Sequence, residues 1–146
     1  MVHADIPTQL DQAAARCAAH GAQLTALRRQ VLELVLRAGQ PVGAYALLDQ
    51  LRGSRAGAAP PTIYRALDFL LDQGLVHRIE RLNAFIGCDA AGHAHSHQFL
   101  ICKTCGVTQE LHDHGAEAAL AAAAAKRGFV PARMTVEIEG VCADCS

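Results

Sequence analysis

The sequence lacks any apolar run near the ~18 residues that a membrane-spanning helix needs. Its first residues, Met1 to Asp11, have neither the basic start nor the apolar segment of a secretory signal peptide. We therefore exclude a membrane protein and expect a cytoplasmic one. Tryptophan is also absent, yet 51% of the 146 residues are hydrophobic, so a packed core is feasible and wholesale disorder is excluded.

The chain has little excess charge of either sign. Its net charge of −1 excludes a uniformly basic nucleic-acid binder. The two halves differ, however. Residues 1–81 carry nine arginines, no lysine and seven acids, whereas residues 82–146 carry four basic residues and seven acids. This asymmetry indicates two modules with different partners.

Apolar periodicity predicts helices in the first half and a mixture of elements in the second. We expect helices over 8–21, where Thr8 is the cap, and over 26–38, 45–51 and 62–73. Short strands are predicted over 75–80, 84–88, 98–101 and 107–111, a helix over 116–126, and a last strand over 129–139. Helices followed by a small hairpin are typical of a winged helix-turn-helix, although many unrelated helical domains also carry a hairpin.

Two Cys-x-x-Cys pairs are the clearest chemical signal. Cys102 and Cys105 form the first, and Cys142 and Cys145 form the second. Four thiolates can hold one zinc ion in a tetrahedron. Redox dithiols and buried free cysteines are the alternatives, but a redox pair usually opens a helix, whereas Cys102 follows a predicted strand. We therefore favour a structural zinc site.

A looser set of potential ligands lies between residues 77 and 114, which contain six of the eight histidines. The set comprises His77, Cys88, His93, His95, His97, Glu110, His112 and His114. Zinc accepts imidazole, thiolate and carboxylate ligands together, so a mixed site is chemically sound. Histidines on a surface loop are the alternative. The neighbouring four-cysteine site favours a second metal.

The predicted helix that starts near Thr62 has the features of a DNA-reading element. The N-terminus of a helix presents free amides to phosphate, and Arg65 can bind a guanine edge with two hydrogen bonds. These few residues fit the solvated face of an amphipathic helix equally well.

Longer matches distinguish these alternatives. The chain resembles the bacterial zinc uptake regulators, a branch of the ferric uptake regulator superfamily, over nearly its whole length. The matching segments are Leu24–Thr25 with Arg28, Ala44–Asp49, Pro60–His77, Cys88, Phe99–Gly106 and Cys142–Cys145. The resemblance implies an α+β chain with a winged-helix DNA-binding domain over 1–83, a hinge over 84–92, and an α/β dimerisation and zinc-binding domain over 93–146.

The resemblance also implies a function and a set of site residues. It implies a zinc-responsive repressor of zinc uptake genes that is not an enzyme, with operator DNA and a second copy of the chain as partners and neither a membrane nor a small-molecule substrate. Two dimers on one operator are a further implication. The residues implied are Cys102, Cys105, Cys142 and Cys145 for structural zinc; His77, Cys88, His95 and Glu110 for regulatory zinc; Tyr45, Thr62, Tyr64 and Arg65 for DNA; and Asp49 and Arg52 for contact between neighbouring dimers on DNA.

Two departures from the superfamily pattern stand out. Ala26 and Leu27 replace the Pro-Gln that often follows Leu-Thr, a change at a helix start. The superfamily's additional metal site would fall near Ser96, Gln98, Glu117 and Met134, of which only Glu117 is a plausible zinc ligand. A variant third zinc site could use His93, His97, His112 and His114.

Other functions have weaker support in the sequence. A sensor of iron, manganese, nickel or peroxide is disfavoured because the Cys88 thiolate favours zinc over harder ions. A zinc hydrolase would keep an open coordination position, which four protein ligands close. A metal-storage protein has no need of the helix that begins near Thr62 or of an arginine-rich first half.

Overall fold

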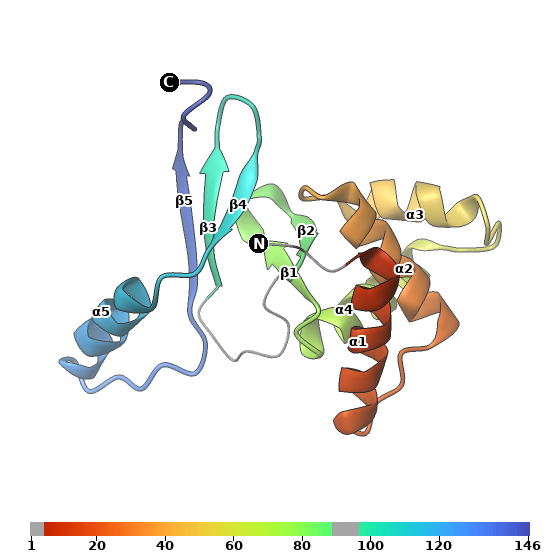
Figure 1. Ribbon diagram of the computed structural model, residues 1–146, viewed down its shortest axis with the longest axis horizontal. Helices are drawn as coiled ribbons and strands as arrows, with labels where there is room; N and C mark the ends of the chain where they lie inside the picture. Colours follow the sequence, from red (N-terminus) through yellow and green to blue (C-terminus); the bar gives the residue numbers. More distant parts are fainter. Residues whose placement is uncertain (1–4, 89–96) are drawn as a thin grey trace. The chain divides into compact units, whose positions relative to one another are not determined.

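The computed structural model describes residues 5–88 and 97–146, and the chain divides into two compact units (Figure 1). The first unit spans Met1–Gly92 and the second spans His93–Ser146. In the described part of the chain, no helix is both long and apolar enough to cross a membrane.

Among its described residues, 5–88, the first unit has four helices, which enclose its core. They are α1 (Ile6–Ala19), α2 (Ala26–Ala38), α3 (Ala44–Arg52) and α4 (Pro60–Asp72). The core contains leucines and valines from all of them, including Leu10, Val31, Leu47 and Leu67. The prediction for α2 is confirmed to the residue: the Thr25 hydroxyl accepts the Arg28 N–H at 3.3 Å, and Gly39 ends the helix with φ +66°.

Helix α1 differs from its predicted range. It begins at Ile6, and the Asp5 carboxylate accepts the Thr8 N–H at 2.9 Å, so Asp5 rather than Thr8 is the cap. An aspartate at the N-cap satisfies a backbone donor that would otherwise lack an intrahelical partner. The Pro7 that follows suits the first turn, where its missing N–H costs nothing.

Helix α4 shows why this segment folds against the core. Its buried residues recur at helical spacing, with Ile63, Ala66, Leu67 and Leu70 on one face. Burying each large aliphatic side chain stabilises the fold by roughly 1.5–3 kcal/mol. Gly74, with φ +69°, allows the turn that leads from the helix into the hairpin.

The hairpin of the first unit consists of β1 (Val76–Ile79) and β2 (Ala84–Gly87), which pair antiparallel around a 3-10 turn over Glu80–Leu82. Asn83 closes that turn with φ +47°. The Val42 backbone bridges to Phe85 and thereby ties the hairpin to the helices. The segment 84–87, which we expected to open the hinge, therefore belongs to the wing of the first unit.

Over residues 97–146, the second unit contains a three-stranded sheet and one helix. Its elements are β3 (His97–Cys102), β4 (Thr108–Leu111), α5 (His114–Ala125) and β5 (Thr135–Gly140). The strand order is β4-β3-β5, with β3 antiparallel to β4 and parallel to β5. The last strand begins later than predicted, since residues 129–134 form an irregular connection. The α+β class is confirmed.

Candidate functional site

The parallel pairing of β3 and β5 brings the two Cys-x-x-Cys pairs together. Cys102 ends β3 and lies opposite Gly140 at the end of β5, two residues before Cys142. Each strand then runs into a tight turn that carries the second cysteine of its pair. In the first turn Gly106 adopts φ +79° and its N–H donates to the Cys102 carbonyl at 2.9 Å. In the second, the Cys145 N–H donates to the Cys142 carbonyl at 3.1 Å.

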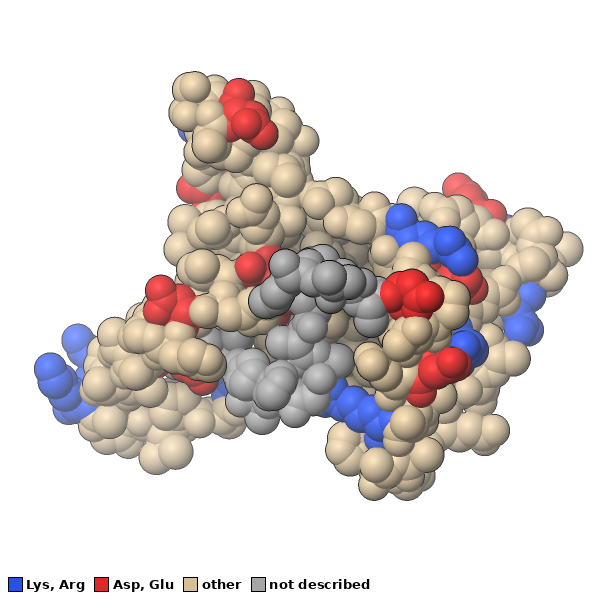
Figure 2. Space-filling view, in the orientation of Figure 1, with Lys and Arg blue, Asp and Glu red and all other residues tan. Residues whose placement is uncertain are grey.

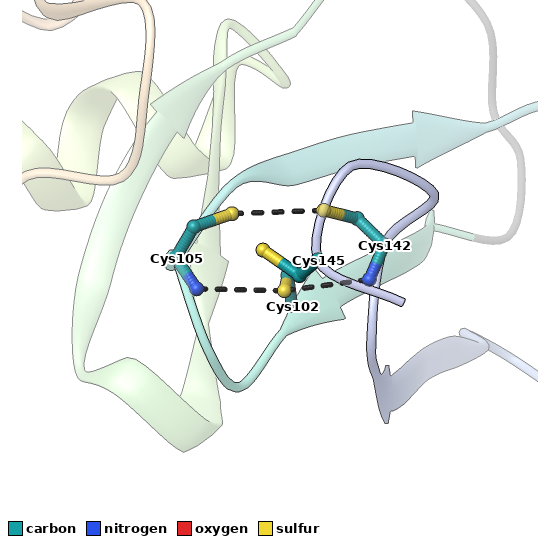
Figure 3. Close-up of side chains that lie close together, drawn as sticks. All are labelled: Cys102, Cys105, Cys142 and Cys145. Carbon is teal, nitrogen blue, oxygen red and sulfur yellow. Dashed lines mark hydrogen bonds between the residues drawn. The ribbon is translucent and has the colours of Figure 1, made fainter.

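The four sulfur atoms converge on one point (Figure 3). All of them lie within 4.8 Å of one another, and the Sγ atoms of Cys105 and Cys142 are 3.7 Å apart. A tetrahedral zinc site with Zn–S bonds of ~2.3 Å has sulfur–sulfur edges of about 3.8 Å. The donor set and its spacing therefore fit a closed, four-thiolate zinc site.

Backbone N–H groups prepare one of these sulfurs to carry charge. Cys102 is buried, and its Sγ accepts the N–H of Cys105 at 3.5 Å and that of Cys142 at 3.4 Å. These donors lower the pKa of Cys102 to about 5. The thiols of Cys142 and Cys105 beside Cys145 raise the pKa of that residue to about 12. A cation bound among the four sulfurs would stabilise their thiolate forms together.

His77 and Cys88 of the predicted regulatory site lie together in the first unit. His77 is a buried residue of β1, and Cys88 directly follows β2. Their ligand atoms lie within 4.8 Å of each other, because the hairpin pairs their neighbours Val76 and Gly87. Of the other two predicted ligands, Glu110 belongs to β4 of the second unit, and His95 lies outside the described residues.

The histidines predicted for a third metal do not form a cluster in the part of the chain that the structure describes. His97 begins β3, His112 is exposed after β4, and His114 is the first residue of α5. Among residues 5–88 and 97–146, these three do not converge as potential ligands. His93 lies outside those ranges.

The predicted DNA-facing side chains lie on α3 and α4. Tyr45 is 70% exposed, Tyr64 is 42% exposed, and Arg65 is exposed as well. The Thr62 hydroxyl, also predicted to face DNA, accepts the Ala59 N–H at 3.3 Å and keeps its own hydrogen as a donor. On the face shown in Figure 2, basic and acidic side chains of the first unit are interspersed, so no continuous basic surface covers that face.

The side chain of Arg52 makes a contact that the sequence pattern does not predict. Its Nε donates to the Ala58 carbonyl oxygen at 2.9 Å, across the loop that joins α3 to α4. Asp49, its predicted companion, is exposed one turn earlier on α3.

Comparison with known proteins decides the family. The profile of the Ferric uptake regulator family matches residues 19–139. The chain belongs to this family. Within it, the chain is 40% identical to the "Zinc uptake regulation protein" of Escherichia coli (strain K12) over 137 residues, 93% of this chain and 80% of that protein.

Two solved structures of family members extend this similarity to three dimensions. One, a "Zinc Uptake Regulator Complexed With Zinc AND DNA", has a TM-score of 0.91 and 38% identity, over 97% of this chain and 95% of its own. The other, a crystal structure of "holo XcZur", has a TM-score of 0.85 and 42% identity, over 94% of this chain and 96% of its own. The predicted winged-helix domain followed by a dimerisation domain is thereby confirmed as the fold class.

Proposed function

We propose that the chain is a zinc-responsive, DNA-binding repressor of zinc uptake genes. The observation that carries this proposal is the 40% identity to a zinc uptake regulation protein over 93% of the chain. The four-cysteine cluster and the exposed start of α4 supply the two chemistries that such a regulator needs. The protein is then a regulator rather than an enzyme, and it acts in the cytoplasm.

The four-cysteine cluster would hold a structural zinc ion. With four thiolate ligands the coordination shell is closed, so the ion adds folding free energy and offers no position to a substrate. Because the ligands lie at the ends of β3 and β5 and in the turns that follow, the ion would clamp the end of the chain to the sheet.

The regulatory zinc would be held by His77, Cys88, His95 and Glu110, which gives two zinc ions per protomer. The proximity of His77 and Cys88 supports the half of this site that belongs to the first unit. With its other ligands in the second unit, the site would restrict the angle between the units. Fewer angles then compete with the one that fits DNA, and zinc raises the affinity for the operator.

Operator DNA would be read by α4 and its surroundings. A recognition helix enters the major groove with its N-terminal residues toward the bases. Thr62, Tyr64 and Arg65 occupy that end of α4, and the exposed Tyr45 begins the neighbouring helix. Two such helices in a homodimer would match half-sites separated by whole helical turns. Asp49 and Arg52 would link neighbouring dimers where two bind one operator.

The second unit supports homodimer formation through its uncovered apolar surface. None of the residues of α5 is buried in the protomer, and Leu120 is 45% exposed. On β5, which forms an edge among the described strands, Ile138 is 49% exposed. An apolar hollow on the same sheet is lined by Leu100 and Val107 as well as Ile138. A second copy that covers these surfaces removes them from water.

We expect Leu120→Asp to weaken the dimer by at least about 2 kcal/mol, roughly 30-fold in dissociation constant, because a charge would be buried in the interface. Since Leu120 is exposed in the protomer, the fold should persist. Sedimentation velocity over a dilution series measures the change, with Gln50→Asp on the exposed face of α3 as the matched control. A variant that dimerises like the control would place the interface elsewhere.

The proposed function is tested by fluorescence anisotropy of a labelled palindromic, AT-rich operator, titrated with the protein at buffered free zinc concentrations. Metal content is measured on the same samples. Affinity that rises with free zinc while a second equivalent is taken up supports the proposal. Binding that is independent of zinc, or absent on candidate operators from zinc importer genes, contradicts it.

Arg65→Ala should weaken specific binding by about 1–3 kcal/mol if its guanidinium reads a guanine. Zinc stoichiometry should not change, because Arg65 lies on α4, a helix that contains none of the predicted zinc ligands. The measurement compares affinities for operator and random duplexes at fixed salt. Equal losses on both duplexes would instead identify Arg65 as a phosphate contact.

A further inference from the structure

We propose that Arg52 positions the start of α4 for DNA reading, in addition to any contact between dimers. The inference rests on the proposed function, and its basis is the hydrogen bond from Arg52 Nε to the Ala58 carbonyl oxygen, 2.9 Å long and partly buried. Arg52 is the last residue of α3, and Ala58 lies two residues before α4. One side chain therefore spans the loop between the two helices.

Backbone bonds hold part of this loop, since the Arg55 N–H donates to the Leu51 carbonyl at 2.9 Å and the Ala58 N–H donates to the Arg55 carbonyl at 3.0 Å. Residues 53–57 are all exposed, and two of them, Gly53 and Gly57, are glycines. Ala58 is the buried anchor of the loop, with 8% of its surface exposed. Ordering an exposed, glycine-containing segment costs conformational entropy, and a side-chain bond to the carbonyl of its buried end restrains where the loop meets α4.

The hydrogen bond from Arg52 is important because α4 begins without an N-cap side chain that could accept a backbone N–H. Its N-cap residue is Ala59, whose side chain has no oxygen to accept a helix N–H. Such caps are worth about 1 kcal/mol where they exist. Here the Thr62 hydroxyl accepts the Ala59 N–H, and Arg52 holds the preceding carbonyl. The two contacts together set where the helix begins, and with it the direction in which Tyr64 and Arg65 project.

Other side-chain hydrogen bonds hold the first residues of the loop, so they do not replace the Arg52 bond at its last residues. The Arg55 Nε donates to the Gln30 Oε1 at 2.8 Å, and the Gln30 amide donates to the Ser54 hydroxyl. Both contacts tie the first residues of the loop to α2. Among the side-chain hydrogen bonds of the described residues, the Arg52 bond is the one that reaches Ala58 from outside α4.

The decisive experiment uses the zinc-loaded, full-length protein and a duplex trimmed to one palindrome, which admits a single dimer. We expect Arg52→Ala to weaken binding to this duplex about three- to tenfold, the range for the loss of one typical hydrogen bond, because the lost bond acts on the DNA contacts only through the position of α4. Gln50→Ala, at an exposed position of the same helix, should bind it like the wild type. Arg37→Ala, which removes a positive charge from α2, controls for electrostatics.

Hydrogen exchange of the free protein supplies the second readout. Arg52→Ala should speed exchange of the Ala58, Ala59 and Thr62 amides while the melting temperature stays near that of the wild type. Unchanged affinity on the one-dimer duplex, or lower affinity without faster exchange, would overturn the inference and leave Arg52 a contact to a neighbouring dimer or to phosphate. Failure of the proposed function shows separately, as wild-type protein that lacks zinc-dependent binding.

Discussion

Cys102→Ser is expected to release the zinc of the four-cysteine site and to unfold the second unit, with loss of the dimer. Structural zinc sites contribute folding free energy on the order of 10 kcal/mol in small domains. The second unit has few other sources of folding free energy, because α5 contains no buried residue and the sheet formed by its described residues has three strands. Cys142→Ser should have the same effect, since both cysteines lie at the paired ends of β3 and β5.

Zinc content, circular dichroism and sedimentation measure these effects together. Cys17→Ala is the matched control, because Cys17 is a buried thiol of α1 in the first unit and should leave zinc content unchanged. A Cys102→Ser protein that remains a stable, zinc-responsive dimer would refute a structural role for this cluster.

Cys88→Ser is expected to abolish most of the zinc dependence of operator binding while the fold survives. The substitution removes the soft ligand of the proposed regulatory site but barely changes side-chain volume. The half-exposed position of Cys88 after β2 tolerates a hydroxyl. Each protomer should then keep the one zinc of the four-cysteine cluster, and operator affinity at high zinc should fall toward the zinc-free level.

Anisotropy over buffered zinc, with metal content on the same samples, distinguishes two explanations of Cys88. If it is a zinc ligand, affinity and second-site zinc are lost together. If it is a small packed thiol, Cys88→Ser keeps full zinc-activated binding. That second result would mean that other residues hold the regulatory ion, and the histidines at 93, 95 and 97 are the first candidates.

The helices of the first unit could be predicted well because their signals are local. The stripe of Ile63, Leu67 and Leu70 repeats at helical spacing, and Thr25 and Gly39 mark both ends of α2. The misjudged start of α1 has an equally local cause. Asp5 and Thr8 are both good N-cap residues, and residue type alone leaves open at which of them the helix begins.

The amino-acid sequence by itself determined the cysteine pairs, the helix order and the family resemblance, all of which depend on residue type and spacing. Only the tertiary structure decided which residues distant in sequence meet. The parallel pairing of β3 with β5 brings Cys102 and Cys142 together across 39 intervening residues. The bond from Arg52 to Ala58 and the use of the Thr62 hydroxyl at the start of α4 are likewise visible only in the folded chain. The physical reason is that spacing encodes which face of an element a side chain occupies, whereas contacts between elements depend on packing, which has no periodic signature.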